Sequence, residues 1–212
     1  MSNIGISQPY AEQIVNSGLF PYYDTNNVTA DSFNVSSRIT TDNTFRCIDQ
    51  ATMYAAAVSG AFTRSYYYQS DRTWLGYNPN NVDQLGPVEP GYPYGDPNLP
   101  YYHTHGSDME LWFGGVQPLR DDDDLYAMQL YMDYFGSYIR TRDPNTPQPL
   151  LQLRGYTKTL QSIKKSGAWN PVTAPTGPIM RLDYPAMTAT FVDQPQCQFL
   201  NYSISYYLQG GT

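Results

Sequence analysis

The stretch DDDDLYAMQLYMDYFGSYIRT, residues 121–141, carries the clearest structural signal in the sequence. Four aspartates open it, and negative charge complements the positive end of a helix. Apolar side chains then recur at intervals of three and four, forming a stripe of Leu125, Met128, Met132, Phe135 and Ile139. Tyr131, Tyr134 and Tyr138 form a second stripe. The pattern predicts a helix that is buried over more than half of its surface.

Shorter elements are predicted on both sides of this helix. Residues 44–59 have helical spacing, with Asp42 or Thr44 as the expected cap and Gly60 as the expected stop. A last helix is expected over residues 196–208. Short alternating or β-branched and aromatic runs predict strands at 65–69, 151–154 and 179–183. No internal repeat is visible, so one α/β unit is the simplest interpretation.

Two segments have no periodic pattern. Residues 1–40 contain many Asn, Ser and Thr and are expected to be an irregular lead-in. Residues 75–100 contain six prolines and four glycines, a density that prevents a regular helix or strand ladder. We expect this second segment to be an ordered surface loop that leads to His103 and His105.

Composition excludes several classes of function. The chain has 212 residues, 12 basic and 19 acidic, so its net charge of −7 argues against binding to a nucleic-acid backbone. No apolar run approaches the length of about 20 residues that a membrane-spanning helix needs. The first residues have neither a basic start nor an apolar stretch, so no signal peptide is predicted. The 21 tyrosines, against 8 phenylalanines, are unusual.

Most motifs that carry chemistry are missing from the sequence. There is no Gly-x-Ser-x-Gly elbow, no phosphate-binding glycine loop, and only two histidines for a metal site, so no cofactor or metal is expected. The run of aspartates at 121–124 could suggest calcium, but consecutive acids point in different directions and a solvated helix cap is favoured.

His105 is the best candidate for a catalytic group. It follows a strand and a long loop, the position where sites collect in open α/β sheets, and it precedes an apolar run. Gly106 would permit close approach of a substrate, while Asp108 and Glu110 could orient or polarise the ring. His103, two residues away, is the competing candidate, and a histidine with a purely structural role is the alternative.

The two cysteines, Cys47 and Cys197, match no zinc or redox motif. Two buried free thiols or one disulfide that joins the ends of the chain are both compatible with their spacing. Three glycosylation sequons begin at Asn27, Asn34 and Asn201, close to the number expected by chance. Few lysines, many tyrosines and an acidic isoelectric point favour a secreted protein only weakly.

The stretch HGSDMELWFG, residues 105–114, resembles the catalytic-histidine segment of type B carboxylesterases, the group that includes cholinesterases and fungal lipases. That segment reads His-Gly, a variable residue, an acid, and an apolar stretch that ends in Phe-Gly. Arg142 departs from the family pattern, which has Gly there. The resemblance extends over about residues 41–208, and its further matches come in the family's order at 45–51, 66–68, 95–102, 134–145 and 193–208.

The resemblance implies a specific fold and activity. Residues 41–212 would be the C-terminal part of an α/β-hydrolase fold, with few strands, flanking helices and long loops. The family uses a serine, an acid and a histidine in that order, and only His105 is matched here. The serine elbow, the oxyanion-hole glycines and the acid are expected before residue 1, because Glu12 and Asp24 lie in no matching context.

The resemblance also implies roles for other residues. Asp108 would stand beside the ring of His105, and a disulfide between Cys47 and Cys197 is implied because cholinesterases bridge comparable positions. The intact protein would be extracellular and would hydrolyse a small-molecule or lipid ester, and this chain alone would be inactive. The alternatives are a non-catalytic cholinesterase-like binding or adhesion protein and a tyrosine-rich surface that binds sugars or a partner.

Overall fold

The computed structural model describes residues 8–78, 81 and 84–201, which form a mixed α/β structure. The chain divides into two units with separate cores. We call them the terminal unit and the central unit. The terminal unit comprises residues 1–65, 173–177 and 191–212, and the central unit comprises 66–172 and 178–190.

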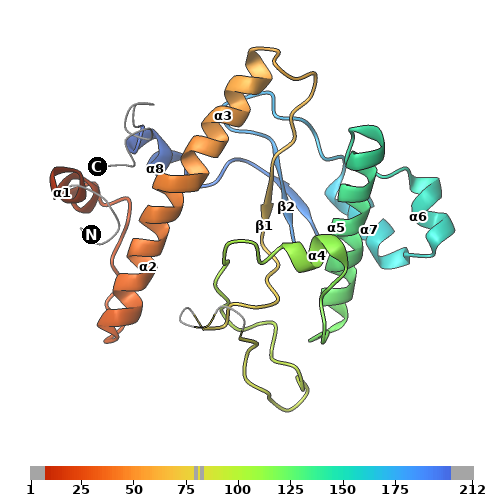
Figure 1. Cartoon of the computed structure of the whole chain (residues 1–212), viewed down its shortest axis with the longest axis horizontal. Coiled ribbons are helices and arrows are strands. Elements are labelled where there is room, and N and C mark those ends of the chain that lie inside the picture. The colour runs from red at the N-terminus through yellow and green to blue at the C-terminus, as the bar shows by residue number, and fades with distance from the viewer. Residues whose placement is uncertain (1–7, 79–80, 82–83, 202–212) are drawn as a thin grey trace. The chain divides into compact units, whose positions relative to one another are not determined.

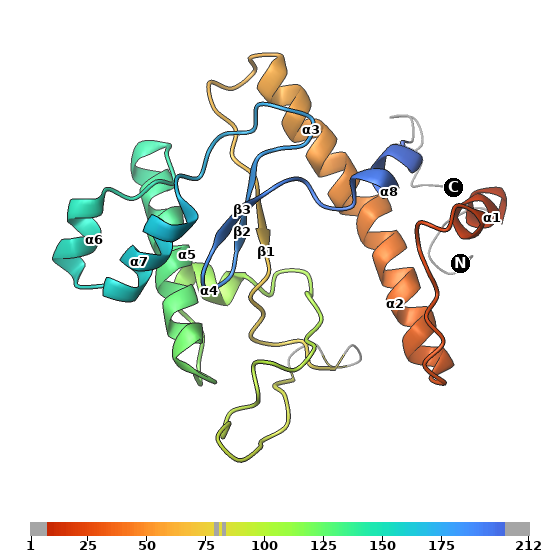
Figure 2. The same cartoon turned by 180° about the vertical axis from the view of Figure 1, so that it is seen from behind.

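A three-stranded sheet lies in the central unit (Figure 1). Strand β1 (Tyr68–Ser70) pairs in parallel with β2 (Ile179–Leu182), which pairs in antiparallel fashion with β3 (Met187–Ala189). Figure 2 shows the β2–β3 pair from behind. Tyr68 lies opposite Met180 across the parallel pair. The strand predictions at 65–69 and 179–183 are therefore confirmed, the first with a shift towards its C-terminal end.

The predicted long helix is present as α5 (Asp122–Thr141), and the short helix α4 (Met109–Phe113) packs beside it. The side chain of Asp121 caps α5 by accepting a hydrogen bond from the backbone N–H of Asp124 (2.9 Å). On the sheet side, the hydroxyl of Tyr131 donates to the carbonyl of Leu182 (2.6 Å). The core of the unit joins both helices to β2 through Leu111, Val116, Ala127, Leu130, Tyr131, Tyr134, Trp169, Met180, Leu182 and Ala186.

The burial of α5 agrees with the prediction only in part. The pattern predicts that both stripes are buried, but Met132 and Ile139 of the first stripe are 38% and 66% exposed, and Tyr138 of the second is 45% exposed. The fully buried side chains on this helix include Ala127, Leu130, Tyr131 and Tyr134. Tyr131 fits the core face because its hydroxyl bonds to the hydroxyl of Ser70 and to the carbonyl of Leu182.

The prediction of a strand at 151–154 is wrong. Helix α6 (Gln148–Arg154) occupies this segment, and α7 (Thr157–Ser166) follows it. An alternation of four residues is too short to separate a strand from a helix. A proline in the first turn of α6 favours a helical start, and Gly155, with φ of 73°, ends the helix in the left-handed conformation.

The terminal unit is built on a long helix that sequence patterns predicted only in part. Helix α2 (Val28–Thr41) runs through a π-helical turn (Asp42–Arg46) into α3 (Cys47–Val58), as Figure 1 shows. The prediction that residues 1–40 are irregular is wrong, because α2 and also α1 (Gln8–Asn16) lie there. The actual cap is Asn27, whose side chain accepts from the N–H of Ala30, so neither expected cap begins a helix.

The last helix of the terminal unit, α8 (Gln194–Phe199), begins close to the predicted position. The remainder of the helix predicted at 196–208 lies largely outside the described residues. Arg46 pairs with Asp193, next to the start of α8, and with the fully buried Asp42. Burial raises the pKa of Asp42 to about 6 in spite of this pairing. Among the described helices, none is long and apolar enough to cross a membrane.

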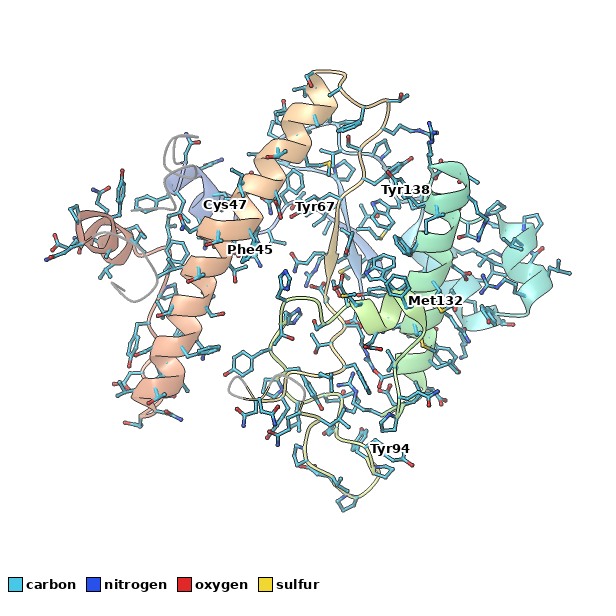
Figure 3. The ribbon with its side chains drawn as sticks, in the orientation of Figure 1. Phe45, Cys47, Tyr67, Tyr94, Met132 and Tyr138 are labelled. Carbon is cyan, nitrogen blue, oxygen red and sulfur yellow. A yellow bond between two sulfur atoms is a disulfide. The ribbon has the colours of Figure 1, made fainter. Side chains whose placement is uncertain are left out.

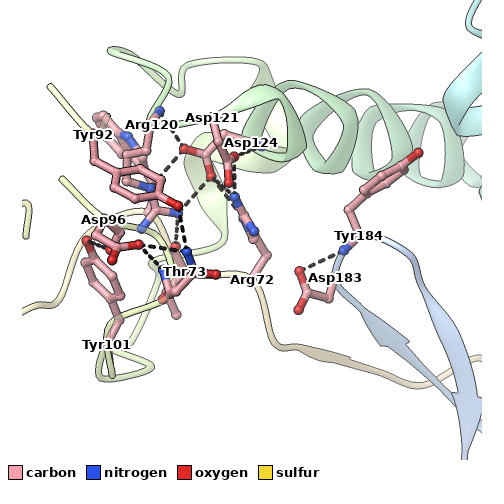
Figure 4. A network of polar contacts seen from close by, with 12 residues as sticks. Arg72, Thr73, Tyr92, Asp96, Tyr101, Arg120, Asp121, Asp124, Asp183 and Tyr184 are labelled. Carbon is pink, nitrogen blue, oxygen red and sulfur yellow. Dashed lines mark hydrogen bonds and ion pairs between the residues drawn. The ribbon is translucent and has the colours of Figure 1, made fainter. Parts of the chain in front are cut away.

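A buried ion network fixes the start of α5 (Figure 4). Asp124 is fully buried, and the guanidinium groups of Arg72 and Arg120 each donate to it at 2.7–2.9 Å. Arg120 also donates to the carbonyl of Thr73 (2.5 Å) and lies 4.8 Å from the ring centre of Tyr101. The aspartate run is thus only partly the solvated cap that the sequence predicted, because Asp124 is buried and binds Arg72 and Arg120.

The variant Asp124→Asn is expected to lower the free energy of unfolding by about 3–5 kcal/mol, since it leaves two arginines without their buried anion. Burial opposes ionisation, but Arg120 and Arg72 lower the pKa of Asp124 below its ordinary value of 3.8. The stabilisation that ionised Asp124 gives is therefore present at neutral pH, and it is lost as the pH falls below about 4.

Urea unfolding at pH 7 and pH 3 measures this effect, with Asp122→Asn as the control. Asp122 lies in the same turn but is exposed, so its change is expected to stay within about 0.5 kcal/mol. Equal losses in the two variants would show that the helix dipole, and not the buried network, accounts for the effect.

Candidate active-site histidine

The long loop that precedes His105 returns to the end of strand β1. Apart from isolated bridges it has no regular structure over its described part, as predicted. The loop closes where the N–H of Tyr102 donates to the carbonyl of Gly76 (2.8 Å). A side chain at Gly76 would collide with the carbonyl oxygen of Tyr102 at 2.4 Å, so only glycine fits this closure. His103 then lies beside β1, its Nδ1 3.2 Å from the carbonyl oxygen of Ser70.

His105 is exposed on the turn that leads into α4. Gly106, with φ of 78°, makes this turn, and the N–H of Met109 donates to its carbonyl (3.1 Å). Because Ser70 is the last residue of β1, its contact with His103 places this segment at the carboxyl end of the strand. The exposure of His105 agrees with the predicted surface loop, while the catalytic role of His105 stays a prediction.

Asp108 connects the histidine turn to a group of aromatic side chains. Its Oδ2 atom accepts hydrogen bonds from the hydroxyl of Tyr68 and from Nε1 of Trp112, both at 2.9 Å. Burial and the carboxylate of Asp108 raise the pKa of Tyr68, so the hydroxyl stays protonated and donates. Asp108 thus orients two aromatic rings, and its predicted place beside the ring of His105 stays a prediction.

Glu110, the other acid considered beside His105, lies in the first turn of α4. Its carbonyl accepts from the N–H of Gly115 (2.8 Å). Its carboxylate occupies the space that a side chain at Gly115 would need. The carboxylate therefore packs over the end of α4.

An aromatic cavity of about 280 Å³ lies in the central unit. It is bounded by strand β1, helices α4 and α5, and the segment after α7. Figure 3 labels one of its residues, Tyr138, on α5. Its lining is entirely aromatic except for one proline: Tyr66, Tyr68, Trp112, Phe113, Tyr134, Phe135, Tyr138, Pro144 and Trp169. Sequence reasoning missed this cavity, although the tyrosine excess and the Tyr66–Tyr68 run were signals for it.

The cysteines form a disulfide in the terminal unit. Cys47 at the start of α3 and Cys197 in α8 are bonded, with Cα atoms 5.1 Å apart. Figure 3 labels Cys47 on the long helix. The pairing that the family resemblance implied is confirmed, and the alternative of two free thiols is wrong.

In the described part of the chain, no group of three or more His, Cys, Asp or Glu side chains could hold a metal ion. Sequence comparisons add no family assignment. No protein-family model matches the chain, and a search of curated proteins gives no significant match. The resemblance to type B carboxylesterases therefore rests on the ordered segments of the sequence, and the hydrolase activity that it implies is a proposal.

Proposed function

We propose that this chain supplies the catalytic histidine, His105, to a Ser–acid–His triad of a carboxylic ester hydrolase. The serine and the acid would come from polypeptide outside these 212 residues. The observation that carries the proposal is the exposed His105 on a glycine turn, two residues after His103, whose ring contacts the last residue of β1. Sites of α/β proteins collect at such strand ends.

Two further observations support the proposal. The disulfide joins the two positions that the resemblance pairs. A structural disulfide is also typical of secreted proteins, in agreement with an extracellular enzyme. The three strands with their flanking helices are compatible with the end of a larger α/β sheet, because β1 pairs on one side only among the described strands.

The chemistry assigned to His105 is general acid–base catalysis of acyl transfer. A serine hydroxyl would attack the ester carbonyl while the imidazole of His105 takes its proton. The imidazolium would then return that proton to the leaving alcohol. Water would then attack the acyl-enzyme, with His105 taking its proton and returning it to the serine oxygen. An exposed turn permits this role, because the imidazole must reach a nucleophile on another segment.

The chain alone is expected to show no saturable hydrolysis of p-nitrophenyl acetate, because its sequence has no serine in a nucleophile elbow. The measurement is initial rate against substrate concentration, before and after treatment with a serine-directed organophosphate. Saturable turnover that the reagent abolishes would contradict the prediction.

The same proposal is tested at the level of the gene by reading the coding sequence in frame before Met1. A Gly-x-Ser-x-Gly elbow followed by an acidic segment would support the hydrolase. An open reading frame of the same family that lacks this serine would favour the alternative, a non-catalytic binding or adhesion protein.

A further inference from the structure

We propose that Asn27 is a site of N-linked glycosylation, at which an oligosaccharide is transferred from a polyprenyl diphosphate donor to the side-chain amide. The proposal rests on the extracellular location proposed above, because such a transfer takes place in the secretory pathway. It does not rest on the hydrolase chemistry, since Asn27 lies in the terminal unit and His105 in the central unit. The chain contains three sequons, and their surroundings in the structure distinguish them.

Asn27 is an exposed residue at the end of a loop. Residues 18–27 contain no helix or strand, and the backbone of Asn27 itself is not helical, with φ of −121° and ψ of 79°. Thr29, which completes the sequon, is also exposed and lies in the first turn of α2. An exposed Asn-x-Thr sequence at a surface loop is the typical acceptor in a secreted protein, because a glycan is bulky and needs free space.

The two ends of the Asn27 amide have separate roles. Its Oδ1 accepts a hydrogen bond from the N–H of Ala30 (3.2 Å) and so caps α2, while its Nδ2 donates to no group in the described part of the chain. Glycosylation would form a bond from Nδ2 to C1 of the first sugar and break the bond from C1 to the diphosphate oxygen. Nδ2 would lose one of its two protons, and the polyprenyl diphosphate would leave. Because Oδ1 stays a carbonyl oxygen, the glycosylated residue keeps its cap.

The turn before Asn27 is held by bonds that a glycan would leave intact. Asp31, which is buried, accepts hydrogen bonds from the N–H and the hydroxyl of Thr25 at 2.9 and 2.7 Å. Asp24 accepts from the N–H of Asn26 (3.0 Å). None of these bonds uses the side chain of Asn27. The glycosylated chain therefore forms the same turn, with the sugar outside the fold.

The sequon at Asn34 lies in a different environment. Asn34 and Ser36 are both inside helix α2 (Val28–Thr41). Residues two positions apart on a helix do not face each other, so the amide and the hydroxyl that the transferase reads together point to different sides. The middle of the helix would have to unwind before transfer, whereas Asn27 already lies outside it. The third sequon, at Asn201, extends beyond the described residues. We therefore expect Asn27 to be modified and Asn34 to stay unmodified.

Peptide mass spectrometry tests this expectation directly. The 212-residue chain is expressed behind an added signal sequence in a eukaryotic host and recovered from the medium or from the secretory compartments. Peptide N-glycosidase then removes the glycans and leaves an aspartate in place of each glycosylated asparagine. We expect an aspartate at position 27 in most molecules and an unchanged asparagine at position 34.

Thr29→Ala separates the modification from the structural role of Asn27. It removes the hydroxyl that the transferase requires but keeps the cap, and alanine is a better helix former than threonine. The variant is therefore expected to fold and to lose the glycan at Asn27. Thr29→Ser keeps a hydroxyl and should restore the modification. Ser36→Ala is the matched control, since it changes the neighbouring sequon in the same helix, and it should leave the glycan at Asn27 unchanged.

Three results would overturn the proposal: a wild-type chain that carries no glycan at Asn27, a glycan at Asn34 instead, or full modification of Asn27 in Thr29→Ala. The proposed hydrolase function fails on a different observation, the lack of a serine elbow before Met1, which would leave the acceptor role of Asn27 untouched. Conversely, an active and secreted hydrolase with an unmodified Asn27 would overturn the glycosylation site alone.

Discussion

Replacement of His105 by alanine is expected to lower kcat for ester hydrolysis by roughly 10⁴- to 10⁶-fold in the polypeptide that carries both this chain and the serine nucleophile. Without the imidazole, the serine keeps its proton and the leaving alcohol receives none. KM should change little, because the imidazole acts on the reacting atoms. Thermal unfolding should also change little, since His105 is exposed. Steady-state kinetics and a melting curve on the same sample measure both effects.

His103→Ala is the matched control for this experiment. His103 lies two residues away, is also exposed, and contacts the carbonyl of Ser70 at the end of β1. Its loss is expected to change kcat by less than about tenfold, since a positioning contact is weaker than participation in proton transfer. A His105→Ala enzyme with near-normal turnover would refute the assignment, and a collapse of activity in His103→Ala alone would transfer the catalytic role to that residue.

The elements that the sequence predicted well are those with strong local signals. Helix α5 has an aspartate cap and a long periodic pattern, and its bounds match the prediction within one residue. Strand β2 is a short alternating segment with buried ends, and it also matches. Where the periodic pattern was short, the flanking residues decided the structure. The pattern at 151–154 fits a strand in isolation, but the proline start and Gly155 fit a helix.

The sequence allowed His105 to be chosen as the candidate catalytic residue, but it did not allow the contacts of the neighbouring side chains to be predicted. His105 stood out because few other residues could carry catalysis, and its exposure follows from the glycine turn. The bond between Asp108 and Tyr68 could not be foreseen, because these residues are 40 positions apart in the chain. The aromatic cavity escaped prediction for the same reason. Its residues come from separate segments of the chain, and no periodicity connects them.

Removal of the Cys47–Cys197 disulfide is expected to lower the free energy of unfolding by roughly 5 kcal/mol in the chain-entropy model. The bond spans a sequence separation of 150 residues, and the whole central unit lies between the two cysteines. The bond therefore restricts the unfolded chain of both units, while in the folded state it joins α3 to α8.

The test compares the double variant Cys47→Ala/Cys197→Ala with oxidised wild type by urea unfolding, with reduced wild type as the control. Alanine avoids a new buried hydroxyl at Cys47, which is 8% exposed in the core of the terminal unit. Reduced wild type should lose nearly as much stability as the double variant, because both lose the crosslink while only the variant also loses the packing of the sulfur atoms. Suppose that reduction lowers the free energy of unfolding by less than about 1 kcal/mol while the double variant lowers it by several kcal/mol. The packing of the cysteines, and not the closed loop, would then stabilise the fold.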